Sequence, residues 1–326
     1  MKKLLLVCAL LNTLVLKAQF EPQVGLAGNH AIHKTNTAFL GWASGGTLTR
    51  GWQQIDDTSL GYANVGRIEN AWGAAGASGI VSLGDGGIAT LTFENPIANG
   101  EGIDFAIFEN GFAGNTAASA FLELAFVEVS SNGIDFVRFP ATSNTPTTSQ
   151  MGTFDYLIAS SINNLAGKYI GGYGTPFDLN ELKDCTAVNI NAISHVKIRD
   201  VIGSIDPKYA SKDAQGNFIN DPFPTGFGAG GFDLDAVGVL HYSLAQGIAV
   251  DTDLSQYVFP NPCVAGNDLH FTLKNIEKIS LENLQGISIL NDFNGDSFHT
   301  SAINPGVYIL KMSTSHAIFT QKISIQ

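Results

Sequence analysis

The sequence predicts an all-β protein, with a β-sandwich body over residues 19–245, a linker at 246–256 and a smaller β-unit over 257–326. Three observations predict it. Apolar and polar residues alternate over short runs, which is the period of a half-buried strand. Glycine-rich turns separate these runs, and the chain holds 36 glycines. Charged residues make up only 14%, below the share usual in globular chains and typical of short strands joined by tight turns.

The first 18 residues have the pattern of an export signal. Lys2 and Lys3 precede an apolar run from Leu4 to Leu16, and Ala18 offers a small residue for cleavage. This run is shorter than the roughly 18 residues that a membrane helix needs, and no other stretch reaches that length. We therefore predict a cleaved signal peptide over residues 1–18 and no transmembrane segment.

The body shows its strands in a regular order. Asn132-Gly133 between two apolar runs is a strong hairpin signal, because both turn residues must accept positive φ. Residues 161–169 allow one short helix, and 206–231 form a long polar loop. The predicted strands are 80–83, 88–93, 103–108, 121–129, 134–139, 195–201 and 232–242. Strands of this length and spacing predict a sandwich or barrel.

Charge and cysteine content exclude some classes of function. The net charge of −12 repels phosphate backbones, so we expect no nucleic-acid partner. An excess of carboxylates suits Ca²⁺, although plain solubility explains the acidity equally well. The three cysteines, Cys8, Cys185 and Cys263, fall in different predicted segments and do not form a disulfide framework.

The C-terminal unit carries four landmarks in order. Phe259 precedes the rigid Pro260-Asn261-Pro262 bend, Gly286 marks a central turn, Gly306-Val307-Tyr308 opens a strand, and Lys322-Ile323 lies in the last one. In this order the unit resembles the C-terminal sorting domain of Bacteroidetes proteins secreted by the type IX system. We assign the sorting signal to Pro260, Asn261, Pro262, Gly306, Tyr308 and Lys322.

This resemblance implies a fold and a destination. It implies a small immunoglobulin-like β-sandwich that the type IX secretion machinery binds at the outer membrane. It also implies removal of the unit after translocation, often with attachment of the body to a surface lipopolysaccharide. We therefore expect export across both membranes to the cell surface or the extracellular space.

The body resembles a second family. Its segments 81–84, 104–111, 128–136, 177–179 and 231–237 are similar to landmarks of a family of bacterial cell-surface proteins with a discoidin-like, galactose-binding-like sandwich. The resemblance covers about Val81 to Tyr242. It implies a jelly-roll-like fold and a surface location, and no activity.

Acids near the last strand of the body suggest a metal. Asp233 and Asp235 share a strand face with two valines, so their carboxylates should lie at the rim of the core, where a bare charge is costly. The loop before them supplies further oxygens. We predict a structural Ca²⁺ held by Asp206, Asp213, Asn217, Asp221, Asp233 and Asp235. Two alternatives stay open: Asx turns within the loop, and neutralisation by Lys197, Arg199 or Lys208.

A second set of polar residues lies at strand ends. Asp104, Glu109 and Asn110 close one strand, and Glu123 lies on the apolar face of another. If these strands are neighbours, Glu109 and Glu123 converge, and paired carboxylates permit acid–base chemistry such as glycoside hydrolysis. The alternative is an acid paired with an arginine. We take these four residues as candidates for ligand binding.

No catalytic residue is assigned, because no Ser/His/Asp, Cys/His or zinc-ligand set can be assembled from the sequence. Trp42, Trp52 and Trp72 lie near Tyr62, and such rings either stack on sugars or pack a core. We predict a surface-displayed, non-catalytic binding or adhesion protein for a glycan or small nutrient. A secreted polysaccharide hydrolase with paired carboxylates and a structural surface-layer component are the alternatives.

Overall fold

The computed structural model describes residues 20–243, 258–272, 278–285, 287–293, 296–313 and 318–326. The predicted signal peptide, the predicted linker and Gly286 lie outside these residues. The chain divides into two compact units, Met1–Ser243 and Leu244–Gln326, and each is described by itself.

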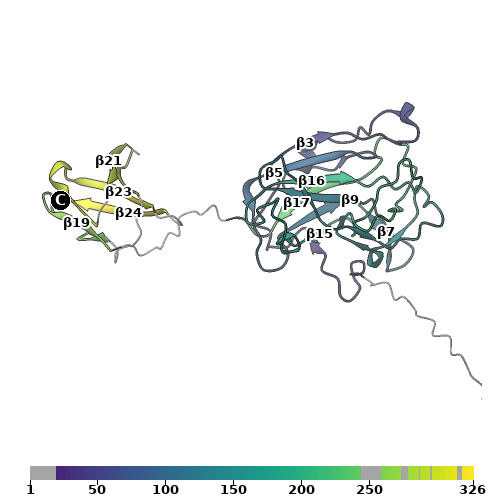
Figure 1. The fold of residues 1–326 in the computed structure, drawn as a ribbon, viewed down its shortest axis with the longest axis horizontal. Coiled ribbons are helices and arrows are strands. Elements are labelled where there is room, and N and C mark those ends of the chain that lie inside the picture. Colours follow the sequence, from purple (N-terminus) through teal and green to yellow (C-terminus); the bar gives the residue numbers. More distant parts are fainter. Residues whose placement is uncertain (1–19, 244–257, 273–277, 286, 294–295, 314–317) are drawn as a thin grey trace, which may run out of the picture. The chain divides into compact units, whose positions relative to one another are not determined.

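Both units are all-β, which confirms the predicted fold class (Figure 1). Short 3₁₀ turns are the only helical segments among the described residues: η1 (Thr58–Leu60), η2 (Ile68–Ala71), η3 (Ala159–Ser161), η4 (Leu179–Leu182) and η6 (Thr300–Ala302). The short helix expected within 161–169 is wrong, because Asn164 adopts φ +52° and interrupts the segment. None of the helical turns in the described part of the chain is long and apolar enough to cross a membrane.

Two antiparallel sheets form the sandwich-like body. The first sheet runs in the order β1 (Ile32–His33), β15 (Tyr173–Phe177), β6 (Phe105–Glu109), β17 (Asp233–Val239) and β2 (Gly41–Trp42), and β4 (Val81–Ser82) also pairs with β17. The second runs β10 (Val137–Arg138), β9 (Ala125–Ser130), β16 (Ile193–Asp200), β5 (Ile88–Ile97) and β3 (Gly45–Thr49), with β14 (Leu165–Ala166) beside β9. Figure 1 shows β5, β16 and β9 of this second sheet side by side.

Smaller pairings complete the body. Strand β8 (Ser119–Phe121) lies between β7 (Phe112–Ala113) and β12 (Leu157–Ile158), and β11 (Thr142–Ser143) pairs with β13 (Ile162–Asn163). The predicted strand 134–139 is much shorter than expected, since only Val137 and Arg138 pair with β9.

The main core lies between the two large sheets. Phe105, Ile107 and Val237 from the first sheet meet Leu91 and Val196 from the second in one buried cluster. Burying such side chains supplies most of the driving force for folding, at about 25 cal/mol per Å² of apolar surface.

The N-terminal segment covers the outer side of the first sheet. Ile32, Phe39 and Trp42 pack on Phe108 and Ala236 there, with the Phe39 and Phe108 ring centroids 5.7 Å apart. As a result every residue of β6 and β17 is buried, on both faces of the sheet. The acidic residues of these two strands are therefore enclosed rather than placed at a rim.

Strand β17 departs from strict alternation. Its pairing with β6 shifts register between Leu234 and Ala236, and Leu234 joins the same core as Val237 and Val239. A bulge of this kind inserts one residue and reverses the face that later side chains occupy. The prediction that Asp235 shares a face with the core valines is therefore wrong.

The C-terminal unit has its own core between two small antiparallel sheets. One contains β18 (Val258–Phe259), β19 (Asp268–Phe271) and β22 (Ser297–His299). The other runs β21 (Ser288–Phe293), β20 (Lys278–Asn283), β23 (Gly306–Ser313) and β24 (Ile318–Ile325). Leu269, Leu281, Leu310 and Ile323 are fully buried in this core.

The Pro260-Asn261-Pro262 bend is tied to the last strand. The Asn261 side-chain amide donates to the Lys322 carbonyl at 2.8 Å and accepts the Ser324 amide at 3.0 Å. Among the other landmarks, the buried Tyr308 donates its hydroxyl to the Asn304 carbonyl at 2.6 Å. The beginning and the end of the unit are thereby joined through one side chain.

We expect Asn261→Ala to lower the free energy of unfolding of the C-terminal unit by about 1–2 kcal/mol, since it removes two hydrogen bonds. All three tryptophans precede residue 73, so tryptophan fluorescence reports the body and far-UV circular dichroism reports both units during urea unfolding. Lys322→Ala is the matched control, because only its main-chain carbonyl accepts the bond. Equal losses in the two variants would refute the role of the Asn261 amide.

Candidate functional site

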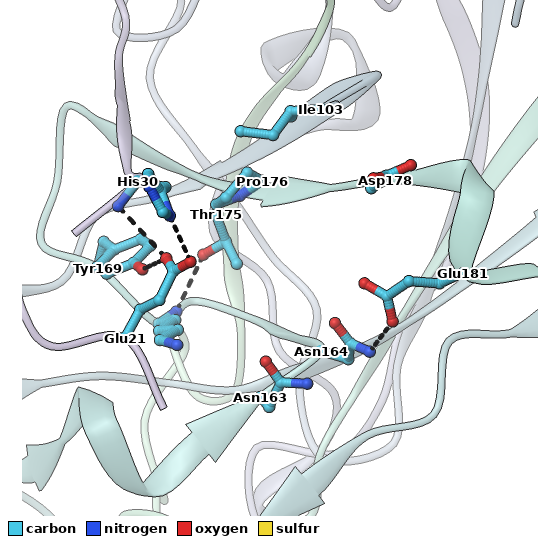
Figure 2. Close-up of a pocket in the computed structure, with 11 residues that line it drawn as sticks. Glu21, His30, Ile103, Asn163, Asn164, Tyr169, Thr175, Pro176, Asp178 and Glu181 are labelled. Atoms are coloured by element: carbon cyan, nitrogen blue, oxygen red, sulfur yellow. Dashed lines mark hydrogen bonds and ion pairs between the residues drawn. The ribbon is translucent and has the colours of Figure 1, made fainter. Parts of the chain in front are cut away.

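A polar cavity of about 170 Å³ opens in the body beside β15 (Figure 2). Its walls come from the N-terminal segment, from the β13–β14 turn, from β15 and from η4. The lining residues are Glu21, His30, Ile103, Asn163, Asn164, Lys168, Tyr169, Thr175, Pro176, Asp178 and Glu181. We call this the polar pocket.

One wall of the polar pocket is organised by Glu21 (Figure 2). Its carboxylate lies 2.6 Å from the His30 Nδ1 atom and accepts the Tyr169 hydroxyl at 3.1 Å. Burial acts to raise the pKa of Glu21, but the hydrogen bonds to His30 and Tyr169, together with the charges of His30 and Lys168, outweigh it and lower that pKa overall. Glu21 is thus held as an anion in a fixed orientation.

Lys168 is the unusual residue of this wall. The side chain is only 4% exposed, and burial lowers its pKa to about 8, against the opposing attraction of Glu21. A buried, charged ammonium destabilises the fold. Buried ionisable groups with shifted pKa values concentrate at functional sites.

The opposite wall presents amides and carboxylates. The Asn164 side-chain amide donates to Glu181 at 2.6 Å, and Asn164 adopts a left-handed backbone conformation that asparagine tolerates better than most residues. Burial raises the pKa of Glu181, although the bond from Asn164 lowers it in part. Asn163 and Asp178 lie beside this pair (Figure 2). The pocket therefore offers donors and acceptors from both sides.

A second depression lies on the outer face of the second large sheet. This groove, of about 460 Å³, is lined by Gly46, Thr47, Thr90, Thr92, Gly133, Phe136 and His195. The Lys197 ammonium lies 3.4 Å from the centroid of the Phe136 ring. We call it the threonine groove.

The structure does not gather the six predicted calcium ligands. Exposed Asp206 accepts the Lys208 amide at 2.9 Å, and buried Asp213 accepts the Gln215 and Asn217 amides at 3.0 and 2.9 Å. Both are Asx-type turns within their own loop, and the Asn217 side chain also bonds Asp213. Asp235 accepts the Gly76 amide at 2.8 Å, and the charge of Lys34 acts on it.

Two of the proposed neutralising bases lie elsewhere, whereas Lys208 lies in the turn that Asp206 caps. Lys197 and Arg199 face Glu128 on the outer side of the second sheet, at 3.5 and 4.0 Å, and Arg138 contacts the same carboxylate at 2.6 Å. Among the described residues, no group of three His, Cys, Asp or Glu side chains stands ready to hold a metal ion.

Two of the predicted calcium ligands, Asp221 and Asp233, lie beside residues of the predicted ligand-binding set instead. Strand β17 pairs with β6 next to Glu109, and the Asn110 amide donates to Asp233 at 3.0 Å. Leu124, which follows Glu123, donates its main-chain amide to Asp221 at 2.9 Å. We call Glu109, Glu123, Asp200, Asp221 and Asp233 the carboxylate cluster.

Burial dominates the electrostatics of the carboxylate cluster. It raises the pKa of Asp233 to about 6 and the pKa values of Glu109, Glu123, Asp200 and Asp221 well above their usual range. Neighbouring carboxylates raise most of these pKa values further; the charge of Glu109, for example, acts on Glu123. The two strands are not the neighbours that the predicted convergence of Glu109 and Glu123 required, because β6 and β9 belong to different sheets. Neither glutamate lines the polar pocket or the threonine groove.

The remaining candidates have structural partners. Asp104 is completely buried and accepts the Gly100 and Leu179 amides, each at 2.7 Å, while the His241 Nδ1 atom lies 2.8 Å away. Trp42 packs on Phe108, whereas Trp52 stacks on Tyr62, which is 54% exposed, at a centroid distance of 4.1 Å.

Sequence reasoning missed the polar pocket. Glu21, Lys168 and Glu181 belong to separate segments, and no spacing in the sequence links them. A lysine inside the apolar stretch around Leu165 to Ile170 is the only local signal, because burial of an unpaired lysine is rare.

Comparison with known proteins identifies one of the two units. The family model described as "Secretion system C-terminal sorting domain" matches residues 257–326. A search of curated proteins finds no match to this chain. The match confirms the predicted sorting tail and, with it, the secretion machinery as a partner. The C-terminal unit is therefore a type IX secretion sorting domain, carried by a protein that this system exports to the cell surface or outside the cell.

Proposed function

We propose that the body is a non-catalytic, surface-displayed binding module for a glycan, and that the polar pocket holds one neutral sugar unit. The observation that carries this proposal is a small cavity walled by hydrogen-bonding side chains on two sides. Its volume of about 170 Å³ is below the ~300–1,000 Å³ of pockets for drug-sized ligands, which favours a single small polar unit.

The chemistry of the walls favours hydroxyl groups as partners. A sugar hydroxyl both donates and accepts hydrogen bonds, so it can donate to Glu21 or Glu181 while accepting from Lys168. Three carboxylates, Glu21, Asp178 and Glu181, line the pocket against one lysine, which disfavours an acidic sugar. Preformed bonds such as the one from Asn164 to Glu181 fix the acceptors before the ligand arrives, and this lowers the cost of binding.

The test is a glycan array probed with the chain from Phe20 to Gln326, followed by calorimetric titration with the sugar that binds. We expect Glu181→Gln and Asn163→Ala each to raise Kd at least tenfold, which corresponds to about 1.4 kcal/mol. Neither residue belongs to a buried core, so folding should be unchanged.

Thr90→Val is the matched control in the threonine groove, since it removes one hydroxyl from the outer sheet face. It should leave Kd unchanged. Loss of binding in Thr90→Val with full binding in Glu181→Gln would move the ligand to the threonine groove. No bound glycan at all would contradict the proposed function.

A further inference from the structure

We propose that the carboxylate cluster is a binding site for one Ca²⁺ ion, centred on Glu109, Glu123 and Asp221 with Asp233 beside them. This location differs from the loop around Asp206 and Asp213, whose carboxylates cap their own turns. The site is independent of the polar pocket and of the function proposed for it.

The cluster encloses five carboxyl groups. Glu109, Glu123 and Asp221 are 1%, 5% and 3% exposed, and Asp200 and Asp233 are 2% and 6% exposed. An isolated buried charge costs several kcal/mol, so buried acids require a proton, a base or a metal ion.

Among the described residues, no base forms an ion pair with the acids of this cluster. The charges that act on Glu109 are those of Asp233 and Asp221, and those that act on Glu123 are Asp233, Glu109, Asp221 and Asp200. All of these neighbours are acidic. Lys197 and Arg199 of strand β16 contact Glu128 on the outer face of the second sheet instead.

Three oxygen atoms of the cluster lack a hydrogen-bond partner. The Glu109 Oε1, Glu123 Oε1 and Asp221 Oδ1 atoms are buried and accept no hydrogen bond. The other carboxylate oxygen of Glu109 accepts the Gly111 amide at 2.7 Å. The other carboxylate oxygen of Asp221 accepts the Leu124 amide at 2.9 Å. One oxygen of each of these two groups is thus oriented by the main chain while the other stays available.

The main chain packs closely beside Glu109 at Gly111. A Cβ atom on Gly111 would lie 2.7 Å from the Phe121 carbonyl oxygen and 2.8 Å from the Glu109 Oε2 atom. Both contacts are too short for a Cβ atom, so the close approach of the main chain to the Glu109 carboxylate requires a glycine.

These donors select the class of ion. All are oxygen atoms, with no imidazole or thiolate among them, which favours Ca²⁺ or Mg²⁺ over zinc or copper. Ca²⁺ accepts six to eight ligands in irregular geometry and binds main-chain carbonyls readily, whereas Mg²⁺ demands a near-ideal octahedron. Because no group of three acids in the described chain is already arranged to hold a metal, we expect the side chains to rotate towards the ion as it binds.

The experiment compares thermal unfolding of the chain from Phe20 to Gln326 in EGTA and in millimolar CaCl₂ at neutral pH. We expect Ca²⁺ to raise the Tm by about 5 °C or more, because a ligand of the native state alone must stabilise it. Elemental analysis of protein purified without chelator should find about one calcium per chain.

Glu123→Gln and Asp221→Asn, which keep the shape of the side chain, should each remove most of the Ca²⁺-dependent shift. In EGTA both variants should melt above the unsubstituted protein, because each removes an unpaired buried charge. A purely structural role for these acids predicts the opposite sign. Glu128→Gln is the matched control, since Glu128 is also buried but is paired with Arg138, and its Ca²⁺-dependent shift should be unchanged.

Equal Tm values in EGTA and CaCl₂, together with substoichiometric calcium, would overturn the proposal and show that the acids are protonated. A full Ca²⁺-dependent shift in both Glu123→Gln and Asp221→Asn would also overturn it, by placing the ion elsewhere.

Discussion

Removal of residues 257–326 will abolish display of this protein on the cell surface and leave it in the periplasm. The removed segment matches the sorting-domain family along its whole length and has a buried core of its own. A machinery that binds a folded unit loses its contact surface when that unit is absent, so the expected effect is complete rather than graded.

Protease digestion of intact cells, followed by immunoblotting of the cell fractions, measures the outcome. Glu181→Gln serves as the control, since it alters only the polar pocket and should be displayed normally. Surface-accessible body in the deletion strain would refute the assignment. Asn261→Ala should also reduce display, because it replaces an assigned sorting residue and removes the two hydrogen bonds that join the bend to the last strand.

Lys168→Met will stabilise the body at pH 7 by about 3 kcal/mol. Burial lowers the pKa of Lys168 from 10.5 to about 8, and this difference is the cost of keeping the ammonium charged in the fold. Methionine has a similar length and no charge, so it avoids that cost while it fills the same space.

The pH dependence of the stability difference between the two proteins tests this prediction more specifically. Between pH 8 and about 10.5 the unfolded chain holds a proton on Lys168 that the folded chain has lost, so the stability of the unsubstituted protein rises with pH across this window. The advantage of Lys168→Met should therefore be largest below pH 8 and shrink to nothing near pH 10.5. Urea unfolding at several pH values measures it.

Lys183→Met is the control, because Lys183 is exposed and its replacement should change stability little at any pH. A less stable Lys168→Met protein, with a difference that does not vary with pH, would show that the ammonium stabilises the fold. If Lys168→Met is more stable and also binds the sugar more weakly, stability and binding compete at this residue.

Some strand faces followed the local pattern and others did not. Strand β16 alternates between buried Val196 and Ile198 and half-buried Lys197 and Arg199, as period two predicts. Strand β17 does not, because a bulge near Asp235 shifts its register and the N-terminal segment covers its outer side. Alternation in sequence predicts which residues share a face, but not what another segment places against that face.

The convergence of Glu109 and Glu123 was a conditional prediction. It depended on the two strands being neighbours, but β6 and β9 belong to different sheets. The charges of Asp221 and Asp233, from a distant loop and strand, act on both glutamates. The polar pocket had no such sign in the sequence, because its walls come from segments more than a hundred residues apart, such as those of Glu21 and Glu181.

The all-β character and the sorting tail were determined by the sequence alone. Strand period, glycine turns and the Pro260-Asn261-Pro262 landmark depend on residues within a few positions of one another. Only the tertiary structure decided which polar groups meet: the walls of the polar pocket, the bases that pair with Glu128 at the outer sheet face and the enclosed acids of the carboxylate cluster. The physical reason is that hydrogen bonds, burial and charge act through space, and long-range chain packing sets those distances.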